Sequence, residues 1–381
     1  MRIVFVTGSL VHGGAERHTI TLANRLAERG HDCHAAYVKP DHSQRLRYRI
    51  AEVACLEARR YLDLRAVRGL ADLVRKARPT AIVAANPYAL LYAQLARRWA
   101  ASRAPLAVVF HSTRMRTLRE RAQMLYYRPL FWRAECAVFV CEAQRAHWRR
   151  RQVIGRRDTV IYNGVDIEHW RPWAGPESAR LRGALGFGAG DFVVGLSAVL
   201  RAEKNPVQLV EAVAMLRRRG VPARGLFIGD GELRGTVEAR ARALGIAPDV
   251  AVTGFQQDVR PFLAACDAVV LTSRTEAFSL AAVEAMALGK PVVHSAVGGA
   301  AEMIEPGRTG WLFPAGDTAA LVERLLALAA PGVAADMGRH SREAVVARFS
   351  ERTMVDHYEQ LLSGLEMTTS HDGIRSTAGA H

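Results

Sequence analysis

The chain alternates short, continuous apolar runs with longer segments in which apolar residues recur every three or four positions. Continuous apolar runs are typical of strands buried on both faces, and the longer segments have the spacing of amphipathic helices. The predicted strands are 3–7, 33–38, 81–85, 106–111, 137–141, 159–162, 192–197, 225–229, 250–253, 268–272, 291–295 and 310–313. The predicted helices include 15–28, 64–76, 206–218, 232–244, 281–288 and 318–329. This alternation predicts an α/β fold with parallel sheets covered by helices on both faces.

The strands form two series, separated by the Pro- and Gly-rich stretch Arg171-Pro172-Trp173-Ala174-Gly175-Pro176. We therefore predict two doubly wound domains, over residues 1–172 and 173–350. The polar composition of residues 367–381 predicts a disordered tail. Open parallel sheets bind ligands beyond the carboxyl ends of their strands, so two such domains facing each other would enclose a cleft.

The composition fits a globular protein with large cores. The chain has 381 residues, half of them apolar, and no apolar run reaches the roughly 18–20 residues that a membrane helix needs. Met1-Arg2 leads directly into the first strand, which argues against a signal peptide and for a cytoplasmic protein. The five cysteines include no Cys-x-x-Cys pair, so they indicate neither a disulfide framework nor a zinc site.

The positive charge is concentrated in the first domain. The formal net charge is +15, and residues 103–158 hold 13 Arg or Lys against 4 Asp or Glu. Within this stretch lie Arg114, Arg116, Arg119 and Arg121, followed by Tyr126, Tyr127, Phe131 and Trp132. This basic and aromatic surface is expected to dock on anionic lipid; the alternative is ordinary packing of the aromatic rings beneath solvated arginines. No nucleic-acid-binding module is recognisable, so nucleic acid is not expected as a partner.

Two features follow strands of the first domain. Gly13 and Gly14 precede a predicted helix, where glycine lets the backbone approach a ligand and the helix N-terminus offers amides to an anion. The alternative is a plain tight turn. His111 ends a predicted strand and could hydrogen-bond a hydroxyl or act on a proton, although a lone histidine is more often a structural residue. His12, His18 and His294 are competing candidates.

Two loops of the second domain offer charged groups. Lys204, with Arg201 close by, precedes a predicted helix, a position suited to a diphosphate or to plain surface charge. In the segment 273–293, Glu276 lies in a loop after a strand, and Glu284 lies on an apolar helix capped by Ser279. A buried carboxylate at Glu284 needs hydrogen-bond donors, from ligand hydroxyls or from elsewhere in the protein. The amides of Phe278, Ser279 and Leu280, at the helix start, could hold a phosphate.

These motifs together resemble the GT-B fold glycosyltransferases of family GT4, the retaining, metal-independent group 1 enzymes. The resemblance runs from the first strand to about Leu365. It rests on the Glu-x7-Glu pair Glu276 and Glu284, and on the following further motifs. These are Gly13-Gly14-Ala15-Glu16, Asn163-Gly164-Val165-Asp166, Gly229-Asp230-Gly231, Gly254-Phe255, and Glu302 with Gly307, Gly310, Trp311 and Leu312. In one position the chain departs from the family, because Val199 stands where many members have an arginine.

The resemblance implies roles for individual residues. Glu276 would contact the hydroxyls of the transferred sugar, and His111 would face that sugar. Glu284 would contact the ribose, and Lys204 the diphosphate. The remaining donor-binding residues would be Gly13, Gly14, Arg201, Gly254, Phe278, Ser279 and Leu280. A final helix at about residues 351–366 would pack back on the first domain.

The expected function is that of a retaining glycosyltransferase using a nucleoside-diphosphate sugar, with UDP or GDP as the nucleotide and no cofactor or metal. The expected acceptor is a lipid-linked or other glycan of a cell-surface polysaccharide, and the enzyme would be cytoplasmic or peripheral at the inner membrane face. Two alternatives remain: a GT-B-fold sugar-nucleotide epimerase, and an inactive protein that binds a membrane surface.

Overall fold

The computed structural model describes residues 1–381 except 11–12, 42–46, 51, 114–117, 174–176 and 378–381; of residues 118–121 and 368–377 only the backbone is described. The chain forms two compact units, one comprising Met1–Asn163 with Arg352–His381 and the other Gly164–Glu351. The sequence predicts the division after residue 172, but it lies after Asn163. The reason is that the segment after Asn163 is hydrogen-bonded to the end of the second unit. The amide of Val165 donates to Phe349 O (3.0 Å), and the amide of Glu351 donates to Val165 O (2.8 Å).

The first unit contains a seven-stranded parallel sheet in the order β3-β2-β1-β4-β5-β6-β7. Its strands are β1 (Arg2–Thr7), β2 (Asp32–Tyr37), β3 (Glu52–Cys55), β4 (Ala81–Ala85), β5 (Leu106–Phe110), β6 (Cys136–Phe139) and β7 (Arg157–Val160). The continuous apolar runs predict all of these strands except β3. That strand lies at the edge of the sheet and is half-buried along its length, so it lacks the apolar run of a central strand.

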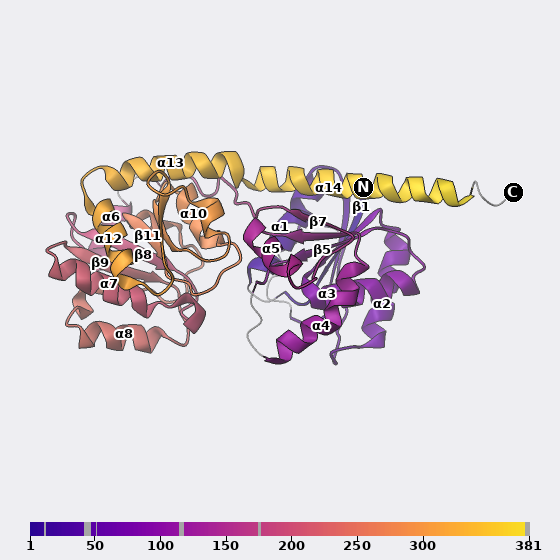
Figure 1. The fold of residues 1–381 in the computed structure, drawn as a ribbon, viewed down its shortest axis with the longest axis horizontal. Helices are drawn as coiled ribbons and strands as arrows, with labels where there is room; N and C mark the ends of the chain where they lie inside the picture. Colours follow the sequence, from indigo (N-terminus) through magenta and orange to yellow (C-terminus); the bar gives the residue numbers. More distant parts are fainter. Residues whose placement is uncertain (11–12, 42–46, 51, 114–117, 174–176, 378–381) are drawn as a thin grey trace. The chain divides into compact units, whose positions relative to one another are not determined.

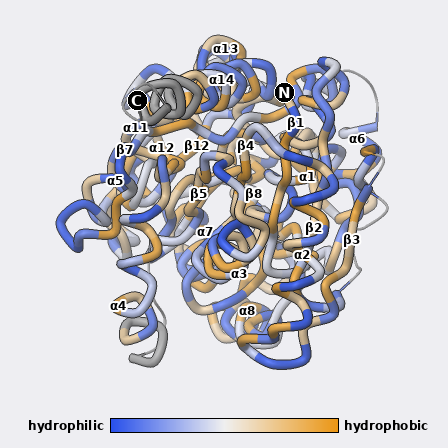
Figure 2. The backbone as a smooth tube through the Cα atoms, turned by 90° about the vertical axis from the view of Figure 1, so that its right-hand side faces the viewer, coloured by the Kyte–Doolittle hydropathy of each residue, from blue (hydrophilic) through white to orange (hydrophobic). Residues whose placement is uncertain are grey.

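Helices cover both faces of this sheet (Figure 1). They are α1 (Gly14–Glu28), α2 (Leu64–Ala77), α3 (Asn86–Trp99), α4 (Leu118–Trp132) and α5 (Glu142–Arg149). One apolar core lies between the sheet and α2, α3 and α4, and a second lies on the opposite face against α1. The strands between them are therefore apolar on both sides, and Figure 2 shows the long hydrophobic stretch along β1.

The second unit contains a six-stranded parallel sheet in the order β10-β9-β8-β11-β12-β13. Its strands are β8 (Phe192–Ser197), β9 (Ala223–Ile228), β10 (Val250–Val252), β11 (Ala268–Leu271), β12 (Val292–Ser295) and β13 (Gly310–Phe313). Its helices are α6 (Glu177–Ala184), α7 (Val207–Arg218), α8 (Arg234–Ala243), α9 (Arg260–Ala264), α10 (Leu280–Ala287), α11 (Ala300–Met303), α12 (Thr318–Ala329) and α13 (Val333–Arg348). The chain builds outward from β8 to β10 and then restarts at β11, so the topological switch point lies between β8 and β11.

The last helix, α14 (Glu351–Thr377), belongs to the first unit from Arg352 onward and lies along it in yellow in Figure 1. Its apolar face completes the core against α1 through Met354, Val355, Tyr358, Leu362 and Leu365. The helix continues to Thr377, into the segment for which the polar composition predicts disorder. Helix extension adds one backbone hydrogen bond per residue once a packed turn has formed, which lets a polar segment continue a buried helix.

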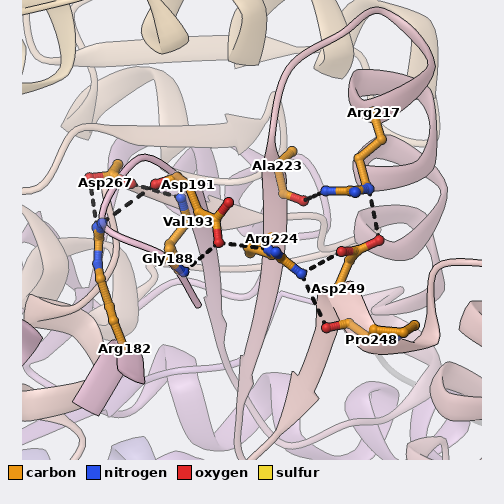
Figure 3. Close-up of polar contacts among 10 residues, drawn as sticks. All are labelled: Arg182, Gly188, Asp191, Val193, Arg217, Ala223, Arg224, Pro248, Asp249 and Asp267. Carbon is orange, nitrogen blue, oxygen red and sulfur yellow. Dashed lines mark hydrogen bonds and ion pairs between the residues drawn. The ribbon is translucent and has the colours of Figure 1, made fainter. Parts of the chain in front are cut away.

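A network of ion pairs joins the amino ends of the strands in the second unit (Figure 3). Arg224, on β9, pairs with Asp191 ahead of β8 and with Asp249 ahead of β10. Arg217, at the end of α7, pairs with Asp249 (2.7 Å). The side chains of Asp191 and Asp249 are only 11% and 9% exposed, so these are largely buried charges. This edge is opposite to the one at which the predicted site residues lie.

Within the described part of the chain, no single helix is long and apolar enough to cross a membrane, and only the bent pair α12 and α13 meets that test of length and composition.

Candidate functional site

The loop between β11 and α10 holds the first of the two predicted glutamates. Ser279 caps α10, because its Oγ accepts a hydrogen bond from the amide of Ala282 (3.3 Å). Gly289 follows the helix with a φ of 75°, a conformation that ends a helix at little cost for glycine. The predicted N-cap and helix end are thus confirmed, and the amides of Phe278, Ser279 and Leu280 lie at the start of this helix.

Glu276 and Lys204 form an ion pair at the switch point of the second unit. Lys204 ends the short 3₁₀ turn Ala202–Lys204 after β8, and Glu276 lies in the loop after β11. Both side chains are 18% exposed, and Ser273 Oγ donates to Glu276 Oε2 (3.4 Å). A carboxylate and an ammonium group therefore lie in contact, both partly buried, at the edge where open α/β sheets bind ligands.

Backbone contacts hold these two loops together. Thr272 Oγ1 donates to Lys204 O (2.8 Å), and the amide of Arg274 donates to Glu203 O (2.8 Å). Both bonds join the loop after β8 to the loop after β11, so Lys204 and Glu276 are positioned by fixed backbone.

Sequence reasoning did not identify the loop after β12 as a support for Glu276. Gly298 in that loop has a φ of 55°, and a Cβ built on it would lie 2.0 Å from Glu276 O. The amide of Gly299 donates to Ala277 O (2.8 Å), and Ser295 Oγ donates to Ser273 O (2.5 Å). The signal in the sequence is the Gly298-Gly299 pair in the loop that follows a strand, where only glycine allows this close approach.

Replacing Gly298 by alanine is expected to displace the backbone of Glu276 and to lower activity by about 10²-fold, since small misplacements at a reacting centre are costly. The matched control is Gly220→Ala, because Gly220 also has a positive φ (82°) but no atom lies within 4 Å of an added Cβ. Steady-state rates of both variants would separate the steric contact from backbone strain. Equal losses in the two variants would contradict this role for Gly298.

The other predicted residues of the second unit lie in different surroundings. Glu284 lies within α10, is 6% exposed, and is surrounded by buried neighbours along the helix. Arg201 pairs with Glu203 (2.7 Å), while the side chain of Val199 is 57% exposed. Gly254 follows β10 with a φ of 71° and forms an isolated bridge with Gly229. Of the two predicted cations, Lys204 therefore pairs with Glu276, whereas Arg201 pairs with Glu203.

In the first unit, His111 lies at the carboxyl end of β5. Its amide donates to Asn86 Oδ1 (3.1 Å), and its ring packs edge to face on His18, with the ring centroids 4.8 Å apart. Among the described residues, Nε2 of His111 has no hydrogen-bond partner. Gly13 is the N-cap of α1 and Gly14 its first residue, so the helix begins one position before the predicted start at 15, whereas His12 lies outside the described residues.

Stability should decrease on acidification because of buried histidines. Burial lowers the pKa of His111 to about 4, and it lowers the pKa of the fully buried His294 to about 4 as well. In the unfolded chain both pKa values return to about 6.5, so the unfolded state binds more protons between about pH 6.5 and pH 4. The stabilisation is therefore present above about pH 6.5 and is lost as the pH falls toward 4.

Urea titrations at about pH 7 and about pH 5 would measure this loss as a lower free energy of unfolding. In His294→Asn the loss should be smaller, because the amide can keep a hydrogen bond to Ser295 O, which lies 2.7 Å from Nδ1, without titrating. An unchanged pH dependence in that variant would contradict a contribution from His294.

The expected basic and aromatic surface is only partly formed. Tyr127 and Phe131 are buried in the core of the first unit, at 5% and 0% exposure, so including them in a docking surface is wrong. They occupy the inward stripe of α4, which the helical period assigns to the core. Arg114 and Arg116 lie outside the described residues, as do the side chains of Arg119 and Arg121. Tyr126 and Trp132 are exposed, at 54% and 47%.

Two family models match the chain in succession. The model for Glycosyltransferase Family 4 matches residues 12–169, and that for Glycosyl transferases group 1 matches residues 177–343. The chain is 30% identical over 257 residues to the putative glycosyltransferase EpsD of Bacillus subtilis (strain 168), covering 66% of this chain and 67% of EpsD. It is 26% identical over 206 residues to an Escherichia coli UDP-Gal:alpha-D-GlcNAc-diphosphoundecaprenol alpha-1,3-galactosyltransferase, covering 53% of each protein.

Solved structures share the fold over nearly the whole chain. The Anabaena protein Alr3699/HepE in complex with UDP superposes with a TM-score of 0.85 at 24% identity, covering 96% of this chain and all of that one. The same protein in complex with UDP-glucose superposes with a TM-score of 0.82 at 25% identity, covering 95% and 99%. The fold and the family models agree with the EpsD match, and together they show that the chain is a group 1 glycosyltransferase of family GT4 with the GT-B fold.

Proposed function

We propose that this glycosyltransferase is a retaining, metal-independent enzyme that transfers a sugar from a UDP- or GDP-sugar to a glycan acceptor of a cell-surface polysaccharide. The observation that carries the proposal is the pairing of Lys204 with Glu276 at the switch point of the second unit, next to the helix that holds Glu284. An anion-binding and a hydroxyl-binding group are thereby adjacent, as a nucleoside-diphosphate sugar requires. The complexes of the Anabaena protein with UDP and UDP-glucose support this class of donor.

The proposed donor site assigns each group a separate task. The ammonium group of Lys204 and the amides at the start of α10 bind the diphosphate. The carboxylate of Glu276 accepts hydrogen bonds from the hydroxyls of the transferred sugar, and the buried carboxylate of Glu284 accepts them from the ribose. As the glycosidic bond breaks, negative charge grows on the departing nucleoside diphosphate, and the fixed cation and amides stabilise it without a metal ion.

Thermal denaturation with UDP-, GDP- and ADP-sugars tests the donor. One class should raise the melting temperature, since a ligand at 100 times its Kd stabilises a protein by about 2.7 kcal/mol. Lys204→Ala should lose most of this shift, whereas Lys76→Ala, which removes an exposed lysine of the first unit, should keep it. Absence of any shift, or isomerisation of the donor without acceptor, would count against the proposal; the second result would identify an epimerase.

We also propose that the outer stripe of α4, made of Leu125, Tyr126 and Trp132, docks on an anionic membrane surface and brings the enzyme to a lipid-linked acceptor at the cytoplasmic face. These side chains are exposed by 61%, 54% and 47%, and they lie in the most basic stretch of the chain. Apolar side chains flanked by arginines suit the boundary between headgroups and acyl chains. The diphosphoundecaprenol-linked substrate in the name of the Escherichia coli relative supports such an acceptor.

Sedimentation with liposomes tests the docking. The protein should pellet with vesicles containing phosphatidylglycerol and remain in solution with phosphatidylcholine alone. Replacing Leu125 and Tyr126 by serine should reduce pelleting, whereas Met367→Ser should not, although Met367 is exposed to a similar degree, 62%. Equal recovery with both kinds of vesicle would remove the proposal.

A further inference from the structure

A group of aromatic rings lies at the switch point of the first unit. β1 and β4 are neighbours in that sheet, although the chain builds outward from β1 to β3 before it restarts at β4. Tyr88 follows β4 in the first turn of α3, directly against Gly8 at the end of β1. A Cβ built on Gly8 would lie 3.3 Å from Cδ1 of Tyr88. Tyr88 thus lies where open α/β sheets bind ligands.

Tyr61 extends this aromatic surface from the loop ahead of α2. Its ring centroid is 5.3 Å from that of Tyr88, and its side chain is 46% exposed. The loop is fixed, because Tyr92 Oη donates to Tyr61 O (3.2 Å) and accepts from the amide of Asp63 (2.9 Å). The hydroxyl of Tyr61 also bonds that of Tyr127 on α4. An exposed ring held this firmly has lost its conformational freedom before any ligand arrives.

A cation completes the group. Lys39 follows β2, its amide donates to Gly8 O (3.0 Å), and its Nζ lies 5.4 Å from the ring centroid of Tyr88. Lys39 is exposed and forms no ion pair with another residue in the described ranges of the chain. Arg59 and Arg60, next to Tyr61, are exposed as well. Of the two carboxylates in this short loop, that of Asp63 accepts from the amides of Arg59 and Arg65 and so caps α2, and that of Glu57 is exposed.

We propose that Tyr61, Tyr88 and Lys39 bind the acceptor, and that this acceptor is a sugar ring bearing a phosphate ester. A ring face of tyrosine offers an apolar surface for the C–H groups of a pyranose, and a lysine ammonium group binds phosphate as a point charge. We call Tyr61, Tyr88 and Lys39 the acceptor platform. Asn86 Oδ1, which accepts a hydrogen bond from the amide of His111, lies two positions before Tyr88, so the first turn of α3 positions both the platform and His111. The inference rests on the proposed transfer reaction, because that reaction requires an acceptor beside the donor.

Ligand-observed NMR on the full chain tests the platform without any need for turnover. The probes are N-acetylglucosamine, its 1-phosphate, its diphosphate linked to a short prenyl chain, and inorganic phosphate. The 1-phosphate should bind at least about tenfold more tightly than the uncharged sugar or inorganic phosphate alone, which corresponds to one charge-assisted contact. If the prenyl-linked diphosphate binds more tightly than the 1-phosphate, the phosphate belongs to a lipid carrier. If the prenyl-linked diphosphate and the 1-phosphate bind equally, the acceptor is a free sugar phosphate.

Variants separate the two parts of the platform. Lys39→Met should abolish the preference for the phosphorylated sugar, and Tyr88→Ala or Tyr61→Ala should weaken every sugar probe by about tenfold. Trp99→Ala is the matched control, since Trp99 is exposed by 48% at the far end of α3 and should leave binding unchanged. Failure of every phosphorylated sugar to bind the unmodified protein, or binding by the three variants as tight as before, would overturn the proposal.

The donor shift in thermal denaturation is measured on the same variants. It should persist in all of them, because Tyr61, Tyr88 and Lys39 belong to the first unit, whereas Lys204, Glu284 and the amides at the start of α10, which are proposed to bind the nucleotide, belong to the second. Loss of the shift already in the unmodified protein would reject the proposed donor, whereas lost probe binding with an intact shift concerns the acceptor platform alone.

Discussion

Glu276→Ala should reduce sugar transfer by about 10³-fold or more, the range expected when a preorganised group that contacts the reacting sugar is removed. The carboxylate is held by Lys204 and Ser273, so its position is set before the donor binds. Without it, Lys204 has no competing partner and should still bind the diphosphate. We therefore expect kcat to fall while the Kd of the nucleotide changes by no more than about threefold.

Initial rates with the donor identified by thermal denaturation, together with nucleotide titrations, would measure both quantities. Glu323→Ala is a suitable control, because Glu323 is an exposed glutamate of the same unit that pairs only with Arg219 in the described structure. Full activity of Glu276→Ala would defeat the assignment of Glu276 to the transferred sugar. A parallel loss of nucleotide binding would instead indicate that Glu276 serves mainly to position Lys204.

Arg224→Met should destabilise the second unit by about 3–5 kcal/mol, the usual cost of removing one partner from a buried ion pair. The substitution would keep most of the side-chain volume and leave Asp191 without its cation, while Asp249 would retain Arg217. Both carboxylates are largely buried, so solvent would compensate for little of the lost charge.

Thermal and urea unfolding would detect this loss as an earlier transition of the second unit. Arg219→Met removes an arginine from an exposed pair with Glu323 and should cost less than about 1 kcal/mol. Arg224→Met should leave the affinity for nucleotide nearly unchanged in the folded protein, because the network lies at the amino ends of the strands. Similar stability of the two variants would show that the network contributes little.

The sequence predicts the sheets well because their central strands are buried on both faces. Residues 268–272 and 291–295, for instance, correspond to β11 and β12, and the capped helix between them begins where Ser279 indicates. The edge strand β3 is missed, since a half-buried strand of four residues has neither a long apolar run nor a clear alternation. The other edge strands, β7, β10 and β13, are still predicted, so the miss follows from the weak apolar pattern of β3 itself.

The site is predicted as a set of residues but not as a set of contacts. Loops that follow parallel strands meet at one edge of the sheet, and this rule correctly groups Lys204 with Glu276. Their ion pair joins residues of two separate loops, so no pattern of neighbouring residues in the sequence predicts it. Arg201, expected at the diphosphate, pairs with Glu203 two positions away, which the sequence does not reveal. Tyr127 and Phe131 are assigned to a surface because nearby arginines dominate the pattern, whereas the helical period places them inside.

The first unit is discontinuous along the chain, because α14 supplies Met354, Val355 and Tyr358 to its core. A ribosome synthesises every residue of the second unit before this helix emerges. During that time the sheet face opposite α2 and α3 lacks the apolar side chains of α14, so the nascent first unit exposes hydrophobic surface that is prone to aggregate. Shielding by a chaperone is therefore most valuable late in translation, and a stop codon just before Arg352 would yield aggregation rather than a stable N-terminal domain.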